Sequence, residues 1–301
     1  MRRLLLSLCL IWVATSPAPA EEVSTRFRGL SLLGNLELAE GKGLESGVSV
    51  VVHGTLAHRG MEIIAALQQH LKTRGVSTLA ITLSLGVDRR TGFFDCGALH
   101  AHRPLDASDE IDAGIGWLKT NGATAIALIG HSVGGNQVAV YAAERNDPSL
   151  GSIVLLAPTT YESARVAERY KARFGAELSE LLAGAQAKVR AGSAVERMSG
   201  IGFLNCENAT ATAGSIVAWY GPDPGRHTPT LLRGMVPRTL VIVAGNDEIV
   251  PDLGEAVLPL VRDAGRGRGE IRVQTIDGAD HFFRALFIED AADIVAEWLK
   301  G

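Results

Sequence analysis

Apolar runs and amphipathic stretches alternate along most of the chain. Short apolar runs typical of strands buried on both faces are followed by stretches whose apolar residues recur at helical spacing. The expected strands cover residues 47–52, 76–83, 125–129, 152–157, 239–244 and 271–276, and the expected helices cover residues 61–75, 106–121, 133–145, 214–220, 253–262 and 285–298. This alternation predicts an α/β fold with a mostly parallel sheet, helices on both faces and right-handed crossovers.

Three shorter segments depart from this alternation. Residues 22–38 carry apolar positions on both sides of Gly34 and Asn35, so they predict an edge hairpin that turns there. Residues 86–107 have no apolar period and predict a long loop over the sheet. Residues 221–230 hold three prolines and predict a stiff loop.

The largest departure is an insert at about residues 160–215. A charged amphipathic helical stretch covers residues 161–195, and no strand pattern follows until Thr239. Ligands of open α/β sheets bind beyond the carboxyl ends of the strands, so we predict that the insert is a helical cap or lid at that edge. The alternative is that its helices pack beside the domain and expose their charged face.

The first 20 residues have the pattern of a secretory signal peptide. Arg2 and Arg3 precede an apolar run over residues 4–13, and Ala18-Pro19-Ala20 offers a cleavage site. The run is about ten residues, whereas a membrane-spanning helix needs about 20, so we expect no stable membrane anchor. The mature chain, residues 21–301, is expected in the periplasm or outside the cell.

Composition favours one ordinary globular domain. The 301 residues are 47% hydrophobic and 21% charged, with a formal net charge of -4. A chain of this length can bury one large core. The charge balance provides no basic field for nucleic acid, so we expect a small-molecule substrate.

Export makes a disulfide the expected state of the remaining cysteines. Removing the signal peptide leaves Cys96 and Cys206, an even pair in a compartment where disulfides persist. Both lie among small, loop-forming residues, and we predict a bridge between them. Two unpaired thiols are the alternative.

A strand, a tight turn and a helix meet at Gly130-His131-Ser132-Val133-Gly134. In a G-x-S-x-G turn, the two glycines let strand and helix close while the serine side chain projects from the sheet. The N–H of Val133 would lie at a helix N-terminus, where partial positive charge stabilises an oxyanion. Ser132 is therefore a candidate nucleophile, against the alternative of an unused serine in a glycine-rich turn.

Two later loops supply the groups that a serine nucleophile requires. Asp247 and Glu248 follow the strand at residues 239–244, and His281 follows the strand at residues 271–276. The carboxyl ends of parallel strands lie at one sheet edge, which is also the edge of Ser132. A histidine there can act as the base, and a carboxylate can orient it.

With these motifs, the chain resembles the α/β-hydrolase superfamily over residues 48–300. The order serine, acid, histidine is specific to that fold among triad enzymes. The resemblance implies Ser132 as nucleophile, His281 as general base and Asp247 as the acid. We prefer Asp247 to Glu248 because Pro251 fixes the loop that follows, although counting from Gly245 selects Glu248.

The resemblance also implies an oxyanion hole. His53-Gly54-Thr55 follows the strand at residues 47–52, so the N–H of Thr55 or Leu56 is expected to act beside that of Val133. His53 itself is expected to hold the loop.

The implied reaction is hydrolysis of a carboxylic ester or thioester through an acyl-enzyme, without a cofactor. The H-x-H of His100 and His102 lacks a further ligand at metal spacing, so loop histidines are favoured over a metal site. Candidates for contacts with substrate are Phe93, Phe94, Tyr161, Arg165, Arg169, Trp219, Tyr220 and Phe282. Carbon–carbon or halide chemistry on the same residues, or a non-catalytic binding protein, are the alternative functions.

Overall fold

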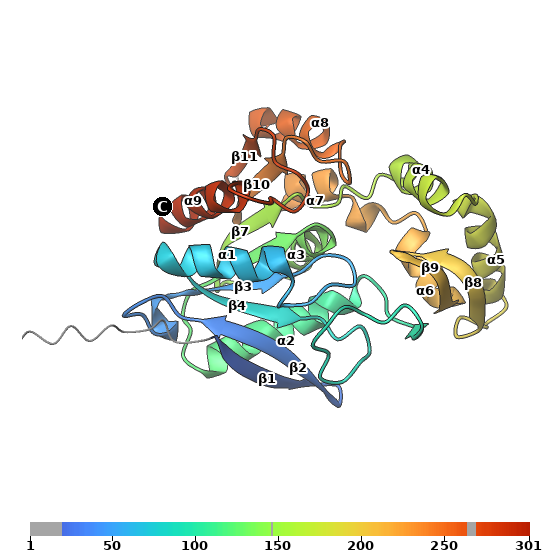
Figure 1. The fold of residues 1–301 in the computed structure, drawn as a ribbon, viewed down its shortest axis with the longest axis horizontal. Coiled ribbons are helices and arrows are strands. Elements are labelled where there is room, and N and C mark those ends of the chain that lie inside the picture. Colours follow the sequence, from blue (N-terminus) through green and yellow to red (C-terminus); the bar gives the residue numbers. More distant parts are fainter. Residues whose placement is uncertain (1–19, 146, 264–268) are drawn as a thin grey trace, which may run out of the picture.

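The computed structural model describes residues 20–145, 147–263 and 269–301 (Figure 1). The predicted signal peptide thus lies almost entirely outside the described residues. The strands of the central sheet are β1 (Glu21–Phe27), β2 (Leu30–Glu37), β3 (Val48–Val52), β4 (Ser77–Thr82), β6 (Ile126–His131), β7 (Leu150–Leu156), β10 (Arg238–Ala244) and β11 (Ile271–Ile276). Their spatial order is β1-β2-β4-β3-β6-β7-β10-β11. All pairs from β4 to β11 are parallel, whereas β1 and β2 form an antiparallel edge.

Helices cover both faces of this sheet, as the sequence predicts (Figure 1). Successive residues of a strand point to opposite faces, so Val50 and Val52 of β3 enter one core while Val51 enters the other. The helices over the face of Val51 are α1 (Glu62–Thr73) and α9 (Phe287–Lys300); over the opposite face lie α2 (Asp106–Thr120), α3 (Val133–Glu144), α7 (Thr228–Gly234) and α8 (Leu253–Val257). Short 3-10 helices occur at Leu44–Ser46, Pro224–Arg226 and Leu258–Asp263.

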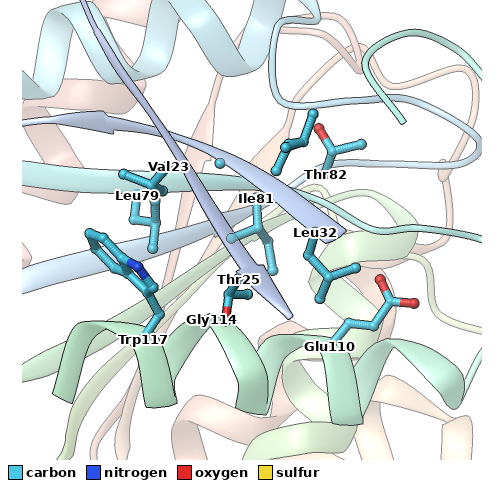
Figure 2. A pocket seen from close by; sticks show the side chains of 11 residues that line it. Val23, Thr25, Leu32, Leu79, Ile81, Thr82, Glu110, Gly114 and Trp117 are labelled. Atoms are coloured by element: carbon cyan, nitrogen blue, oxygen red, sulfur yellow. The ribbon is translucent and has the colours of Figure 1, made fainter. Parts of the chain in front are cut away.

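Side chains fill the space between the antiparallel edge and α2 almost completely. Figure 2 shows the remaining gap, which is lined by Leu32, Leu79, Ile81 and Trp117. Its volume of about 10 Å³ is about the space of one water molecule. This edge therefore stabilises the fold and offers no room for a substrate.

The predicted hairpin forms, but its predicted turn is wrong. The chain reverses at Arg28 and Gly29, which both have positive φ, and Gly34 lies within β2. A Cβ atom on Gly34 would come within 2.8 Å of the Leu79 side chain. Gly34 thus reflects close packing of β2 on its neighbours, which sequence pattern does not distinguish from a turn.

The insert contains strands that the sequence analysis did not predict. It runs through α4 (Ser163–Phe174), α5 (Leu178–Arg190), β8 (Arg197–Phe203), β9 (Cys206–Thr212) and α6 (Ala213–Tyr220). The hairpin of β8 and β9 joins β5 (Leu99–His100) in a separate three-stranded sheet. The expectations of an all-helical insert, and of a loop without any strand at residues 86–107, are therefore wrong. The predicted loop at residues 221–230 is also interrupted by a 3-10 helix and by the start of α7.

The predicted disulfide between Cys96 and Cys206 is present, with its Cα atoms 5.4 Å apart. Cys96 lies in the loop before β5, and Cys206 begins β9, which is the central strand of the small sheet, so the bridge fastens this sheet to the long loop. Within the described ranges, no helix has the length and hydropathy needed to span a membrane.

Reduction of this disulfide is expected to lower the free energy of unfolding by about 2–5 kcal/mol, because it closes a loop of 110 residues. Urea unfolding with and without dithiothreitol measures the effect. As a control, a Cys96→Ala/Cys206→Ala variant should be less stable than the oxidised protein and insensitive to dithiothreitol. Equal stability of the oxidised and reduced wild type would contradict the prediction.

Candidate active site

Ser132 lies in a sharp turn between β6 and α3. Its backbone has φ 57° and ψ -124°, a conformation that residues other than glycine rarely adopt. A Cβ atom on Gly130 would lie 2.4 Å from the carbonyl oxygen of Gly134, and one on Gly134 would lie 2.3 Å from that of His53. Both flanking positions therefore require glycine, as the G-x-S-x-G pattern predicts.

Ser132, His281 and Asp247 form a hydrogen-bonded chain. His281 Nε2 lies 2.9 Å from Ser132 Oγ, and His281 Nδ1 lies 2.8 Å from Asp247 Oδ2. The other carboxylate oxygen, Oδ1, accepts the backbone N–H groups of Ile249 and Val250, each at 2.8 Å. The carboxylate is thus fixed on both sides, and the imidazole joins it to the serine hydroxyl.

The surroundings distinguish Asp247 from its neighbour. Burial alone would raise the pKa of Asp247, but the bond to His281 and the two backbone N–H groups outweigh it and hold the pKa below its usual value. Glu248 is exposed and takes no part in the chain. Asp280 turns away and pairs with Arg284 at 2.9 Å.

His131 is a site residue that the sequence analysis did not single out. Burial, and then the charge of His281, lower the pKa of His131 to about 3, so the imidazole is neutral. Its Nε2–H donates to the carbonyl oxygen of His281 at 2.9 Å. The residue before the nucleophile thus positions the backbone of the histidine loop, a role without a sequence signal.

A second neutral histidine holds the loop after β3, as expected for His53. Its Nδ1–H donates to the Gly54 carbonyl at 2.9 Å, and its Nε2 accepts the N–H of Leu83 at 3.0 Å. Burial, and then the charge of Arg90, lower the pKa of His53 to about 3. Arg90 also donates to the carbonyl oxygens of Leu83 and Leu56. The long loop at residues 86–107 therefore supports the loop that faces the serine.

The three predicted oxyanion residues flank Ser132. A Cβ atom on Gly54 would lie 3.1 Å from Ser132 Cβ, so the loop with Thr55 and Leu56 passes directly beside the nucleophile. Leu56 has φ 55°, and its carbonyl accepts the N–H of Phe94 at 2.9 Å. In the described part of the chain, the N–H groups of Thr55, Leu56 and Val133 have no hydrogen-bond partner. They remain available to a substrate oxygen.

The insert packs against this part of the site. Leu56 and Val133 belong to one apolar cluster with residues of α5, β9 and α6. His100 and His102 lie inside the same region, with His100 Nδ1 3.3 Å from His102 Nε2 and the Phe94 ring against both. Among the described side chains, no third metal-ligating residue joins them.

The predicted aromatic contacts divide into packing and site residues. Phe94 and Trp219 are buried and Tyr220 partly buried in the insert cluster, whereas Phe93 is 63% exposed. Phe282 alone among the five has a ring contact with His281, at 5.2 Å between centroids.

The charged candidates have structural partners. Arg165 pairs with Glu168 on the surface, and Arg169 donates to the carbonyl oxygen of Ile249 at 3.3 Å. The guanidinium carbon of Arg226 lies 3.8 Å from the centroid of the Tyr161 ring. Arg226 is 1% exposed, and its guanidinium donates to the carbonyl oxygen of Ala218 at 2.6 Å. The sequence analysis missed Arg226, since nothing in residues 221–230 distinguishes it from a surface arginine.

Stability is expected to fall as the pH drops from 6.5 towards 3. An unfolded histidine binds a proton near pH 6.5, whereas His53 and His131 in the folded protein bind one only near pH 3. Each therefore lowers the free energy of unfolding by up to about 1.4 kcal/mol per pH unit in this window. Urea unfolding at several pH values measures the slope. His131→Asn should make this slope shallower, and constant stability from pH 7 to 4 would contradict the prediction.

Comparisons with known proteins identify the family and the fold of the chain. A model of the alpha/beta hydrolase family matches residues 50–298. No curated protein sequence matches the chain closely enough to be called a relative.

Three solved structures illustrate the shared fold. Est1E of Butyrivibrio proteoclasticus, solved with ferulic acid, has 18% identity and a TM-score of 0.65, with 92% of this chain and 97% of that chain covered. The Paleococcus ferrophilus monoacylglycerol lipase has 19% identity and a TM-score of 0.62, covering 89% and 98%. A Pyrococcus furiosus esterase has 16% identity and a TM-score of 0.61, covering 97% and 94%.

The family match spans most of the chain. The strand order, and the positions of the segments that carry Ser132, Asp247 and His281, are consistent with it. The chain therefore belongs to the alpha/beta hydrolase family.

Proposed function

We propose that the protein is a serine hydrolase that cleaves carboxylic esters or thioesters through an acyl-enzyme on Ser132. The observation that carries this proposal is the continuous chain from Ser132 Oγ through His281 to Asp247, at 2.9 Å and 2.8 Å. A serine hydroxyl becomes a nucleophile when a base within hydrogen-bond distance takes its proton. The esterases and the lipase of similar fold are consistent with this chemistry.

In the first half of the reaction, Ser132 Oγ attacks the substrate carbonyl carbon while His281 Nε2 takes the hydroxyl proton. The carbonyl oxygen becomes an oxyanion, which accepts hydrogen bonds from the N–H of Val133 and of Thr55 or Leu56. The tetrahedral intermediate collapses as the bond to the leaving oxygen or sulfur breaks. His281 donates its proton to that atom, and the acyl group stays on Ser132.

In the second half, water replaces the leaving group. His281 takes a proton from the water, whose oxygen attacks the acyl carbon, and returns the proton to Ser132 Oγ when the acyl–serine bond breaks. Asp247 holds Nδ1–H throughout and stabilises the imidazolium. The neutral Ser132 and His281 are restored, and the carboxylic acid leaves.

Export is part of this proposal. The sequence at residues 1–20 has the pattern of a signal peptide, and the Cys96–Cys206 disulfide is of the kind that persists in oxidising compartments. Both features favour a periplasmic or secreted enzyme. The insert, whose cluster includes Leu56 and Val133, is proposed as its cap.

A fluorophosphonate probe should label the wild-type protein, because a nucleophilic serine attacks its phosphorus. Ser132→Ala should remain unlabelled and lose p-nitrophenyl acetate hydrolysis, while keeping the unfolding curve of the wild type. Intact-protein mass spectrometry detects the adduct. An unlabelled wild type, or a labelled Ser132→Ala, would exclude Ser132 as the nucleophile.

Asp247→Asn should lower kcat by about 10⁴, because the amide oxygen keeps the N–H groups of Ile249 and Val250 while the NH₂ group donates to His281 Nδ1 and stabilises the unproductive tautomer. The matched variant Glu248→Gln, one residue away on an exposed side chain, should retain kcat within about threefold. Steady-state hydrolysis of p-nitrophenyl acetate compares the two. The reverse ranking would assign the acid to Glu248.

A further inference from the structure

A pocket of about 340 Å³ lies at the edge of the central sheet where the parallel strands begin. Residues near the start of β3, β4, β6, β7 and β10 line it, together with the last turn of α9. Figure 1 shows that this end of α9 lies on the side of the molecule away from the insert. β6 begins at the pocket with Ile126 and leads to Ser132, which is about 20 Å further along at about 3.3 Å per residue. The pocket is therefore separate from the candidate active site.

One register row of the sheet forms a wall of this pocket. Ser49 of β3 pairs with Ala127 of β6. Ala127 also pairs with Ser152 of β7, which pairs with Arg238 of β10. Paired residues point to the same face of a sheet, and this face is the one on which Val154 packs under α1 and α9. Strands covered on both faces are normally continuous apolar runs, so two serines and an arginine in one row depart from the rest of the sheet.

Three polar atoms in the wall have no hydrogen-bond partner among the described residues. They are Ser152 Oγ, Arg238 Nε and Trp298 Nε1. Ser152 and Arg238 are paired in the sheet, and the Arg238 guanidinium carbon lies 3.9 Å from the centroid of the Trp298 ring, so the three groups are neighbours. Ser152 is only 8% exposed and Trp298 1% exposed. Guanidinium and indole nitrogens only donate, and buried donors are normally paired, so these groups indicate a ligand with acceptor oxygens.

The charged side chains around the pocket are all positive. Lys42, Arg238 and Lys300 line it, and in the part of the chain that the structure describes no carboxylate side chain lines it. Lys42 Nζ donates to the Gly75 carbonyl at 2.7 Å, and Arg238 Nη2 donates to the Trp298 carbonyl at 3.0 Å. These bonds hold the ends of two helices but do not neutralise the cations, and none of the three cations forms an ion pair with a described residue. A negatively charged occupant therefore complements the wall.

The rest of the wall is apolar. Val76, Ala127 and Leu299 line the pocket beside the ring of Trp298. An inorganic ion would leave these side chains without a contact, whereas an anionic group on a short apolar body contacts both parts of the wall. The volume of the pocket is at the lower end of the range for small-molecule sites.

We propose that this pocket is a second binding site, for a small organic anion. Its oxyanion group, a carboxylate or a phosphate, accepts hydrogen bonds from the unpartnered donors of Ser152, Arg238 and Trp298. Its alkyl or aryl part packs against Val76 and Leu299. This inference goes beyond the proposed function and does not rest on it.

Isothermal titration calorimetry of the wild-type protein tests both parts of the ligand. The probes are sodium hexanoate, sodium acetate, 1-hexanol and hexyl phosphate at one constant ionic strength, which screens the exposed lysines. Hexanoate should bind at least about tenfold more tightly than acetate, which lacks the apolar chain, and than 1-hexanol, which lacks the charge. Hexyl phosphate distinguishes the two oxyanions, and tight binding of either hexyl anion supports the proposal.

Three outcomes of the titrations would overturn it. The first is that neither hexanoate nor hexyl phosphate binds. The second is that 1-hexanol binds as tightly as the hexyl anions, which would remove the argument from charge. The third is that acetate binds as tightly as hexanoate, which would remove the argument from the apolar wall.

Two variants locate the bound anion. Arg238→Gln removes the charge and the free Nε–H, and should weaken hexanoate binding at least about tenfold. Ala127→Leu narrows the pocket without changing its charge, and should weaken binding by a similar factor even if Arg238→Gln does not fold. The matched control is Arg272→Gln, because Arg272 also lies over the Trp298 ring, at 4.9 Å, but does not line the pocket. The control should keep the wild-type Kd, and urea unfolding compares the stability of the three variants.

Unchanged hexanoate binding in the folded pocket variants would place the anion elsewhere, the candidate active site included, and would overturn the second site. An equal loss of binding in Arg272→Gln and Arg238→Gln would also overturn it, because the effect would then come from Trp298 packing or from net charge.

Discussion

The close approach of the Ser132 turn to the loop after β3 is the constraint on which the rest of the site depends. Gly134 lies against the His53 carbonyl so closely that a Cβ atom would be 2.3 Å from it, and Gly54 lies against Ser132 in turn. Two backbone segments from neighbouring parallel strands are thereby brought into direct contact. A nucleophile on one and N–H donors on the other can then act on a single carbonyl group, since the two glycines leave no side chain between the two segments.

Neutral histidines maintain this arrangement at a cost in stability. His53 and His131 each use one nitrogen as a donor to a backbone carbonyl, His53 to Gly54 and His131 to His281. A lysine or arginine could donate the same bond but would place a charge beside His281. A buried neutral imidazole holds the loops without opposing the positive charge that His281 acquires in the reaction. The price is sensitivity to acid, since both rings resist protonation in the folded protein.

The hydrophobic pattern of the sequence predicts the elements that are determined by residues close together in the chain. Strands such as Val48–Val52 are buried on both faces and read as continuous apolar runs, and their order placed Ser132, Asp247 and His281 at one edge. The strands β8 and β9 escaped prediction because their sequences, RMSGIGF and CENATAT, have little apolar alternation. They are held by pairing with each other and by the disulfide, both long-range effects. The roles of His131 and Arg226 were missed because they also depend on long-range contacts. His131 donates to the carbonyl of His281, and Arg226 is buried against Tyr161.

The disulfide and a buried arginine attach the insert to the rest of the molecule. Cys96–Cys206 joins the insert to the long loop, and Arg226 packs on Tyr161 at its base while donating to the last turn of α6. Separating the insert from the core at these points would expose a nearly fully buried guanidinium and the apolar cluster around Leu56.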